Sequence, residues 1–385
     1  MKSISHCILL SLFFFTACQK QKKSDLNHFP TTPDTLLVKM TKEKGDGLFQ
    51  IGATTPTFKS VTSEFPYSII YPKRIENAER FLFMPNFREK KHYYVDIIKG
   101  TQDGNAVFIV DENNNNDLTD DSIRPIEAMD WNSDKSLVKC NFSVSEGIQT
   151  IQDFSWLKIG TSNNSLLVGR SDHLIGTFNI NKKTYKITAA DPFNSSFSYD
   201  INPQLAVITD KNTIANRDIV SLGEFIKLGN TYYKFHSISD TGSQITLIKE
   251  DNFQTKIGTQ VGMLAPEFTA ITTEKDTIKS VNLNNRLTII ANSCGCGGDK
   301  ASTQAYYDMR DAYTNINILH VDSKIKKATN GLHIDVDNDF NKAFYNTYRK
   351  QYCLRICYVI GKDNRILDTF LITNWKASLT NIVKE

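Results

Sequence analysis

The sequence predicts an antiparallel, sandwich-like β-rich region followed by a C-terminal α/β domain with a mixed central sheet. Residues 36–250 consist of short runs of β-branched and aromatic residues that are divided by turn signals. From Gly262 onward, strand-like runs alternate with helical stretches, which is typical of an α/β domain. A chain of 385 residues has room for two or three domains.

Composition excludes several classes of protein. Hydrophobic residues make up 40% of the chain, so packed cores are expected and wholesale disorder is excluded. The 45 Lys and Arg residues nearly balance the 42 Asp and Glu residues, whereas a nucleic-acid-binding protein would show a strong basic excess. We therefore expect a folded protein that does not bind nucleic acid.

Residues 1–17 have the pattern of a signal peptide. Lys2 supplies a positive charge, residues 8–15 are apolar, and Ala17 is a small residue immediately before Cys18. The apolar run is too short to be a membrane-spanning helix. It resembles a bacterial lipoprotein signal peptide, which implies cleavage before Cys18 and lipidation of that cysteine. A plain secretory signal with an incidental cysteine is the alternative.

Residues 18–35 are interpreted as a tether between the lipid and the folded protein, because the segment is polar and contains two prolines. A lipid anchor would hold the protein at a membrane without crossing it. The localisation that we expect is the cell envelope, outside the cytosol, where disulfides persist.

Residues 36–250 are predicted to be antiparallel β-structure. Alternating runs occur, for example, at 106–110, 183–188 and 232–238. Gly229-Asn230 stands between two such runs, where a hairpin turn belongs. One or two modules are predicted, and a seam between two of them would lie near residues 160–173.

An Asn-rich segment follows one of these predicted strands. Asp111, Asn113, Asn115 and Asp117 place side-chain oxygens at alternate positions, as an oxygen-coordinated cation such as calcium requires. The sixth position is Asn116 rather than Gly, and no Glu stands at the twelfth. A turn with solvated carboxylates is therefore the alternative to a calcium site.

The C-terminal third carries the candidate reactive residues. A strand of the buried type is predicted at 287–291. It is followed by the sequence Ser-Cys-Gly-Cys-Gly-Gly at 293–298, which we call the Cys loop, and a helix is predicted at 300–313. Further strands are predicted at 316–321, 356–360 and 365–371, and further helices at 340–349 and from Trp375. A cysteine at the start of a helix is favoured as the thiolate by the helix dipole, and a nearby second thiol can resolve a mixed disulfide.

Residues 262–268 (Gly-Met-Leu-Ala-Pro-Glu-Phe), the Cys loop and residues 358–366 resemble the redoxin branch of the thioredoxin superfamily. They are most similar to membrane-tethered TlpA/ResA-type thiol–disulfide reductases, and the resemblance covers residues 257–385. It implies a thioredoxin-like domain in which Cys294 attacks a disulfide and Cys296 resolves it. The β-rich region is similar to the extensions that bacterial envelope lipoproteins carry before such domains.

Two departures from the family pattern concern the active site. The family motif is Cys-x-x-Cys, whereas Cys294-Gly295-Cys296 is one residue shorter. The family also has a cis-proline in its substrate-pairing loop, and that neighbourhood here is residues 353–357, which contain Arg355 and no proline. A strained one-residue ring would make the disulfide more oxidising than an ordinary pair.

The loop at 353–357 holds a second pair of thiols, Cys353 and Cys357. We interpret them as a second redox pair, a structural disulfide or a soft-metal site. Cys140 is predicted to be a buried free thiol. His320 and His333 are interpreted as structural residues.

The predicted function is a membrane-anchored thiol–disulfide oxidoreductase that acts on envelope protein disulfides and requires no cofactor. Its expected partners are a protein disulfide substrate or redox partner, and the membrane through the lipid anchor. A redox-inactive binding lipoprotein with a degenerate thioredoxin fold, and a thiol-based metal handler, are the alternatives.

Overall fold

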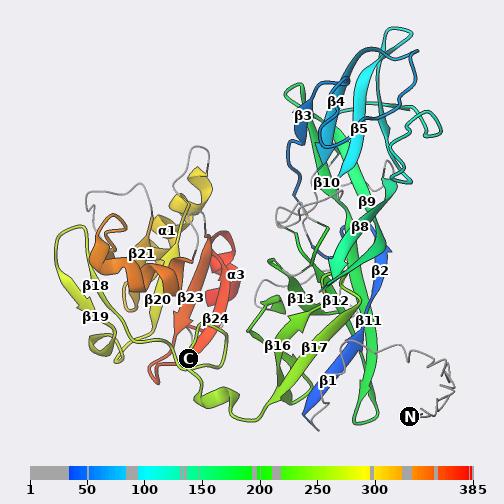
Figure 1. The fold of residues 1–385 in the computed structure, drawn as a ribbon. Coiled ribbons are helices and arrows are strands. Elements are labelled where there is room, and N and C mark those ends of the chain that lie inside the picture. The colour runs from blue at the N-terminus through cyan, green and yellow to red at the C-terminus, as the bar shows by residue number, and fades with distance from the viewer. Residues whose placement is uncertain are drawn as a thin grey trace, which may run out of the picture.

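The computed structural model describes most of the chain after residue 33, and its elements are mainly antiparallel strands (Figure 1). The described residues are 34–49, 52–83, 94–130, 133, 137–146, 148–192, 197–199, 201–209, 218–294, 299–322, 332–350, 354–380 and 382–383. Cys18, Cys296 and Cys353 lie outside these ranges.

Two antiparallel sheets pack together in the first part of the chain. One has the order β3-β4-β5-β6-β7 and consists of β3 (Thr57–Lys59), β4 (Glu76–Phe83), β5 (Val95–Gln102), β6 (Asn105–Val110) and β7 (Arg124–Pro125). The other has the order β10-β9-β8 and consists of β8 (Val138–Glu146), β9 (Gln149–Ser162) and β10 (Ser165–Arg170). Their shared core includes Phe83, Phe108 and Phe142, and the ring of Phe142 stacks on Phe197 at 3.7 Å.

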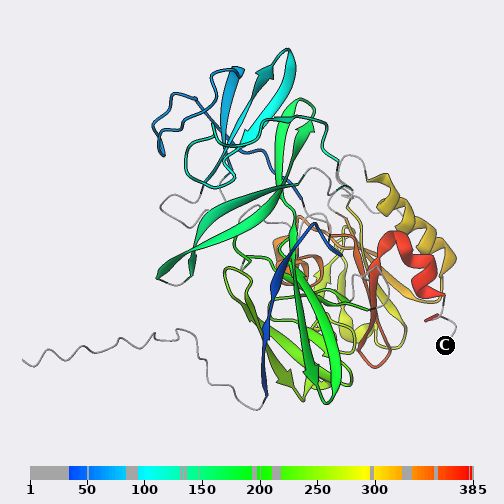
Figure 2. The same cartoon turned by 90° about the vertical axis from the view of Figure 1, so that its right-hand side faces the viewer.

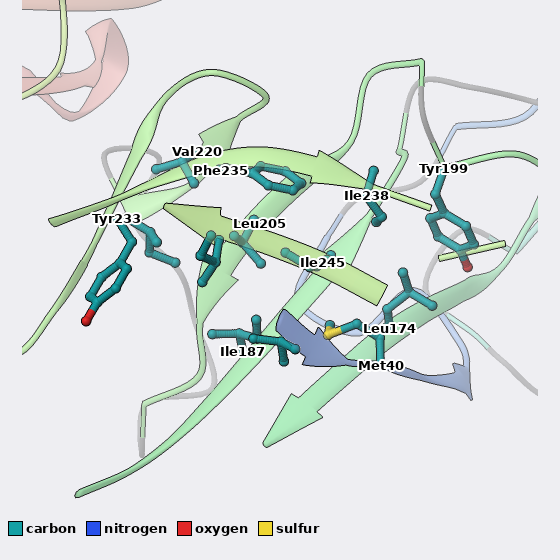
Figure 3. Close-up of a cluster of buried hydrophobic side chains, with 14 of the residues drawn as sticks. Met40, Leu174, Ile187, Tyr199, Leu205, Val220, Tyr233, Phe235, Ile238 and Ile245 are labelled. Carbon is teal, nitrogen blue, oxygen red and sulfur yellow. The ribbon is translucent and has the colours of Figure 1, made fainter. Parts of the chain in front are cut away.

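Two further antiparallel sheets enclose a second core (Figure 3). One has the order β14-β13-β12-β11-β2 and consists of β2 (Thr41–Lys44), β11 (Asp172–Ile180), β12 (Lys183–Ala190), β13 (Gln204–Val207) and β14 (Val220–Ser221). The other has the order β1-β17-β16-β15 and consists of β1 (Thr35–Lys39), β15 (Phe225–Leu228), β16 (Thr231–Ile238) and β17 (Gln244–Glu250). β16 shows why these runs form strands, because Tyr233 and Phe235 face the core while Lys234 and His236 are exposed.

The chain changes sheets at Ser171, since β10 ends one residue earlier and β11 begins one residue later in a different sheet. This point falls within the range where the sequence predicts a seam. The domain boundaries themselves stay a prediction.

The C-terminal part is built on a five-stranded mixed sheet of order β22-β21-β20-β23-β24. β20, β21 and β22 run parallel, and β23 and β24 pair antiparallel. The strands are β20 (Thr288–Asn292), β21 (Asn317–Val321), β22 (Leu332–His333), β23 (Ile356–Ile360) and β24 (Ile366–Leu371). A separate hairpin is formed by β18 (Thr269–Ile271) and β19 (Thr277–Lys279).

Helices α1 (Lys300–Ala312) and α3 (Trp375–Leu379) lie together on one side of this sheet (Figure 2). Their apolar side chains, among them Tyr306, Met309 and Trp375, pack on Ile289 and Ala291 of β20. The other face of the sheet packs against Phe268, Phe344 and Tyr348. The central strands are therefore buried on both faces, which explains their continuous apolar runs.

The helix predicted at 340–349 is not one regular helix. It consists of the 3₁₀ turn η4 (Asp339–Asn341), a single α-helical turn α2 (Lys342–Phe344) and the π-helix η5 (Tyr345–Arg349). The remaining short 3₁₀ turns are η2 (Phe253–Thr255), η3 (Ser280–Asn282) and η6 (Ile372–Asn374). Local periodicity predicted the helical stretch correctly, but tertiary contacts determine its winding.

Candidate functional site

Cys294 lies in the connection between β20 and α1, two residues after the strand ends. It has no exposed surface, and its backbone N–H donates a hydrogen bond to Ser302 Oγ at 3.0 Å. Its sulfur is in a disulfide. Cys140 and Cys357 are the free cysteines of the described ranges, so the partner of Cys294 lies outside them.

The predicted partner, Cys296, is one of the residues outside the described ranges, and so is Cys353. The Cys294–Cys296 couple therefore stays a prediction. Cys357 would also be free if the disulfide partner of Cys294 were Cys353 instead of Cys296. The lipidation residue Cys18 also lies outside the described part of the chain.

The start of α1 carries an ion pair beside the Cys loop. Asp299 is the N-cap, and its carboxylate accepts a hydrogen bond from the Ser302 N–H at 3.1 Å. Its other oxygen pairs with Arg355 Nε at 2.6 Å. Burial alone would raise the pKa of Asp299, but the hydrogen bonds from Ser302 and the charge of Arg355 outweigh it and lower the pKa. Arg355, predicted to lie in the substrate-pairing loop, is thus tied to the N-terminus of α1.

A buried chain of polar side chains lies directly beside Cys294. The Ser293 hydroxyl donates a hydrogen bond to the Asp322 carboxylate, which also accepts one from Thr303 Oγ1 at 3.2 Å. Ser293 Oγ lies 2.8 Å from Nε2 of His320. Nδ1 of His320 in turn lies 2.9 Å from Nδ1 of His333. The parallel pairing of β20, β21 and β22 brings these residues together.

The hydrogen bonds fit a neutral His320. Because the Ser293 proton points to Asp322, Ser293 Oγ accepts from His320 Nε2–H, and His320 Nδ1 then accepts from His333. Burial, together with the charges of His333 and Arg349, holds the pKa of His320 well below its usual value. The imidazole also stacks on Tyr306 with ring centroids 3.5 Å apart. The sequence predicts structural roles for His320 and His333, but it does not predict the hydrogen bond between His320 and Ser293.

Cys357 lies in the core beneath α1 rather than in an open loop. It is part of β23 opposite Ala291, it has no exposed surface, and burial raises the pKa of its thiol. It is free in this structure. The pairing of Cys353 with Cys357 stays a prediction, because Cys353 is outside the described residues. Cys140 is buried and free, as predicted.

The predicted calcium segment forms a closed turn. The Asp111 carboxylate accepts hydrogen bonds from the backbone N–H groups of Asn115 and Asn116 at 3.0 and 2.9 Å. The other three candidate ligands, which are Asn113, Asn115 and Asp117, likewise accept bonds from N–H groups of the loop. Within the described ranges, no group of three or more His, Cys, Asp or Glu side chains could hold a metal ion. Calcium binding stays a prediction of the sequence.

No family model matches this chain, and no curated protein matches it. Solved structures match about a third of it. The C-terminal domain of a protein assigned as a thiol–disulfide oxidoreductase from Bacteroides thetaiotaomicron matches with 15% identity over 33% of this chain and 97% of its own, at a TM-score of 0.27. The thioredoxin domain of a Bacteroides vulgatus thiol–disulfide oxidoreductase matches with 13% identity over 31% and 98%, at a TM-score of 0.25. Copper-bound yeast Sco1 matches with 12% identity over 32% and 93%, at a TM-score of 0.26. These three solved structures are two domains of thiol–disulfide oxidoreductases and Sco1, and each matches about a third of this chain.

Proposed function

We propose that residues 257–385 form a thiol–disulfide oxidoreductase domain in which Cys294 is one half of the redox couple. The observation that carries the proposal is the environment of Cys294. It is disulfide-bonded and stands between a central strand and the N-terminus of a helix that packs on the same sheet. A helix N-terminus favours a thiolate, which is the reactive form in disulfide exchange.

The reaction is a two-electron exchange between two pairs of sulfurs. A thiolate of the reduced couple attacks a substrate disulfide, the substrate S–S bond breaks, and a mixed disulfide forms while one substrate thiolate leaves. The second thiol of the couple, as its thiolate, then attacks the mixed disulfide. This step releases the second substrate thiolate and leaves the protein disulfide. Cys296 is the proposed partner of Cys294 in this couple.

The burial of Cys294 bears on the order of attack. Since its sulfur has no exposed surface in the disulfide form, an incoming thiolate has to attack the other sulfur of the bond. Cys294 then leaves as the thiolate. This argues for Cys294 as the resolving residue and for its partner as the residue that meets the substrate, the reverse of the order that the resemblance implies.

Thiol counting across a series of redox buffers tests the proposal. The wild-type protein should show a reversible two-electron couple, and Cys294→Ser should abolish it because the disulfide can no longer form. Peptide mapping of the non-reduced protein, with Cys296→Ser and Cys353→Ser beside it, identifies the partner. Cys357→Ser is the matched control and should leave the couple unchanged, since this thiol is buried and free.

Two outcomes would contradict the proposal. A protein without a titrating couple would instead support a binding lipoprotein with a degenerate thioredoxin fold. Metal that copurifies with the thiols would support a metal handler.

We also propose that lipidation of Cys18 anchors the protein to a membrane of the cell envelope. The basis is the junction of Ala17 and Cys18 after a short apolar run. No helix within the described ranges is long and apolar enough to cross a membrane. Cys18→Ala should release the protein from the membrane fraction or block its processing, because the variant has no thiol at this position to carry the lipid. A correctly cleaved variant that still sediments with membranes would be evidence against this anchor.

A further inference from the structure

Two unusual backbone conformations follow each other near Ser293 and Cys294. Residues Tyr345–Arg349 form a π-helix, which is rare and frequently found at functional sites. Lys350 then has a φ of 58° and a ψ of −39°, a region that a residue with a side chain seldom adopts. Such conformations persist only where the surrounding structure imposes them.

Contacts on both sides impose the winding of this segment. The Tyr348 hydroxyl donates a hydrogen bond to the Pro266 carbonyl at 2.6 Å. Lys350 Nζ reaches across to Thr259 Oγ1 at 3.0 Å and to the Glu224 carboxylate at 3.7 Å. The contacts therefore hold the residue between them, Arg349, in one place.

Arg349 is fully buried at the end of the central sheet that carries the Cys loop. Its Nη1 lies within hydrogen-bond distance of four oxygens, which are Ser293 O at 2.8 Å, Val321 O at 3.1 Å, Leu354 O at 3.1 Å and Asn292 Oδ1 at 3.4 Å. Asn292 ends β20 and Ser293 follows it, Val321 ends β21, and Leu354 precedes β23. One guanidinium group thus joins three strand ends around Cys294.

We propose that Arg349 is a positioning residue whose buried charge stabilises the Cys294 thiolate when the disulfide opens. The carbonyl that accepts its shortest hydrogen bond belongs to Ser293, and that planar peptide unit ends at the Cα of Cys294. A buried cation that contacts the peptide unit next to a cysteine favours the thiolate over the thiol, and the effect is large where water is excluded. The inference rests on the proposed redox function of Cys294.

The other charged and titratable groups around the Cys loop do not supply this positive charge. Asp299 and Arg355 are paired with each other, and His320 is neutral. Asp322 is an acid and would act in the opposite direction. Among the described residues, the titratable groups packed here also include Tyr306 of α1, His333 of β22 and Cys357 of β23, and the charge of Arg310 of α1 reaches His320 as well. The electrostatic effect of Arg349 also reaches the neighbouring strand β21, since its charge contributes to the low pKa of His320.

Arg349 could instead be a purely structural clamp for the strand ends. Both roles predict that its loss destabilises the protein, because buried carbonyls would lose their donor. They differ in the chemistry of the reduced cysteine. If Arg349 is only a clamp, its replacement leaves the pKa of Cys294 unchanged in any variant that folds. If its charge stabilises the thiolate, its replacement by a neutral residue raises that pKa.

The experiment measures the pKa of the Cys294 thiol in the reduced full-length protein. The Cβ chemical shift of Cys294 is followed by NMR at a series of pH values in protein with ¹³C-labelled cysteine, because this readout needs no reagent to reach the buried sulfur. In the wild type the pKa should lie well below the ordinary value of about 8.5. Arg349→Gln, which keeps a donor but removes the charge, should raise the pKa of Cys294 by about one unit or more. Arg349→Lys should stay near the wild-type value.

The reduction potential gives a second readout. Loss of the charge destabilises the reduced form, so Arg349→Gln should shift the equilibrium towards the disulfide by about tenfold, which is about 30 mV. Arg310→Gln, in the last turn of α1, is the matched control and should change neither value by a comparable amount.

An ordinary or raised pKa of Cys294 in the wild type would overturn the proposal, and this measurement needs no variant to fold. An unchanged pKa in folded Arg349→Gln would overturn it as well. The chemical shift does not depend on turnover, so these failures are distinct from failure of the proposed function, which would appear as the absence of a redox couple.

Discussion

Replacing Arg80 with methionine should lower the free energy of unfolding by about 3–5 kcal/mol. Arg80 in β4 and Asp96 in β5 are both fully buried, and Arg80 Nε lies 2.6 Å from the Asp96 carboxylate. The Tyr67 hydroxyl donates to the other oxygen of that carboxylate at 2.6 Å. The substitution therefore leaves a buried carboxylate without its cation, which costs far more than an exposed ion pair contributes.

Urea unfolding followed by circular dichroism measures this effect as a lower midpoint. The control is the double variant Arg80→Met with Asp96→Leu, which removes both charges and should recover most of the lost stability. A single variant that loses less than about 1 kcal/mol would contradict the prediction, because that loss is typical of an exposed pair. A double variant as unstable as the single one would show that packing, and not charge, explains the loss.

Acidification should destabilise the C-terminal part of the protein through His320. The pKa of His320 is held well below its usual value, chiefly by burial, so the folded protein keeps this residue neutral. The unfolded chain takes up the proton as the pH falls below about 6.5. The stability from neutral His320 is therefore complete above that pH. It is lost on acidification at up to about 1.4 kcal/mol per pH unit.

His320→Gln isolates this effect, because glutamine cannot take up the proton. The variant should be less stable than the wild type at neutral pH, and the difference should shrink as the pH falls from about 6.5 to 4.5. The comparison with the wild type is needed because Asp121 makes the folded protein more stable as the pH falls, whereas His320 makes it less stable. Burial raises the pKa of Asp121 to about 6, so the folded state binds that proton first. His236→Gln, at an exposed position of β16, is the control. A constant difference between His320→Gln and wild type across this range would contradict the prediction.

Local patterns in the sequence located most of the elements around the candidate site. The predicted strand at 287–291 is observed as Thr288–Asn292, and the predicted helix at 300–313 as Lys300–Ala312. Both are encoded locally, the strand by a continuous apolar run and the helix start by its capping residue Asp299. The Cys loop between them follows directly from these two elements.

Hydrogen-bond partners that are far apart in the sequence could not be predicted from local patterns. Ser293 and His320 are 27 residues apart, and His333 follows 13 residues after His320. Each has an ordinary local context. Only the register of the parallel strands, with Ala291 opposite His320 and His320 opposite His333, brings them into one buried hydrogen-bonded chain.

The sequence by itself determined the abundance of antiparallel strands, the strands that flank the candidate site and the position of Cys294 before a helix, because these depend on periodicity and capping within a few residues. Tertiary structure alone decided that Cys294 is buried, that Arg349 lies at the strand ends beside it and that residues 345–349 wind as a π-helix. The physical reason is that burial, charge pairing and unusual backbone conformations depend on which distant groups exclude water and supply hydrogen bonds.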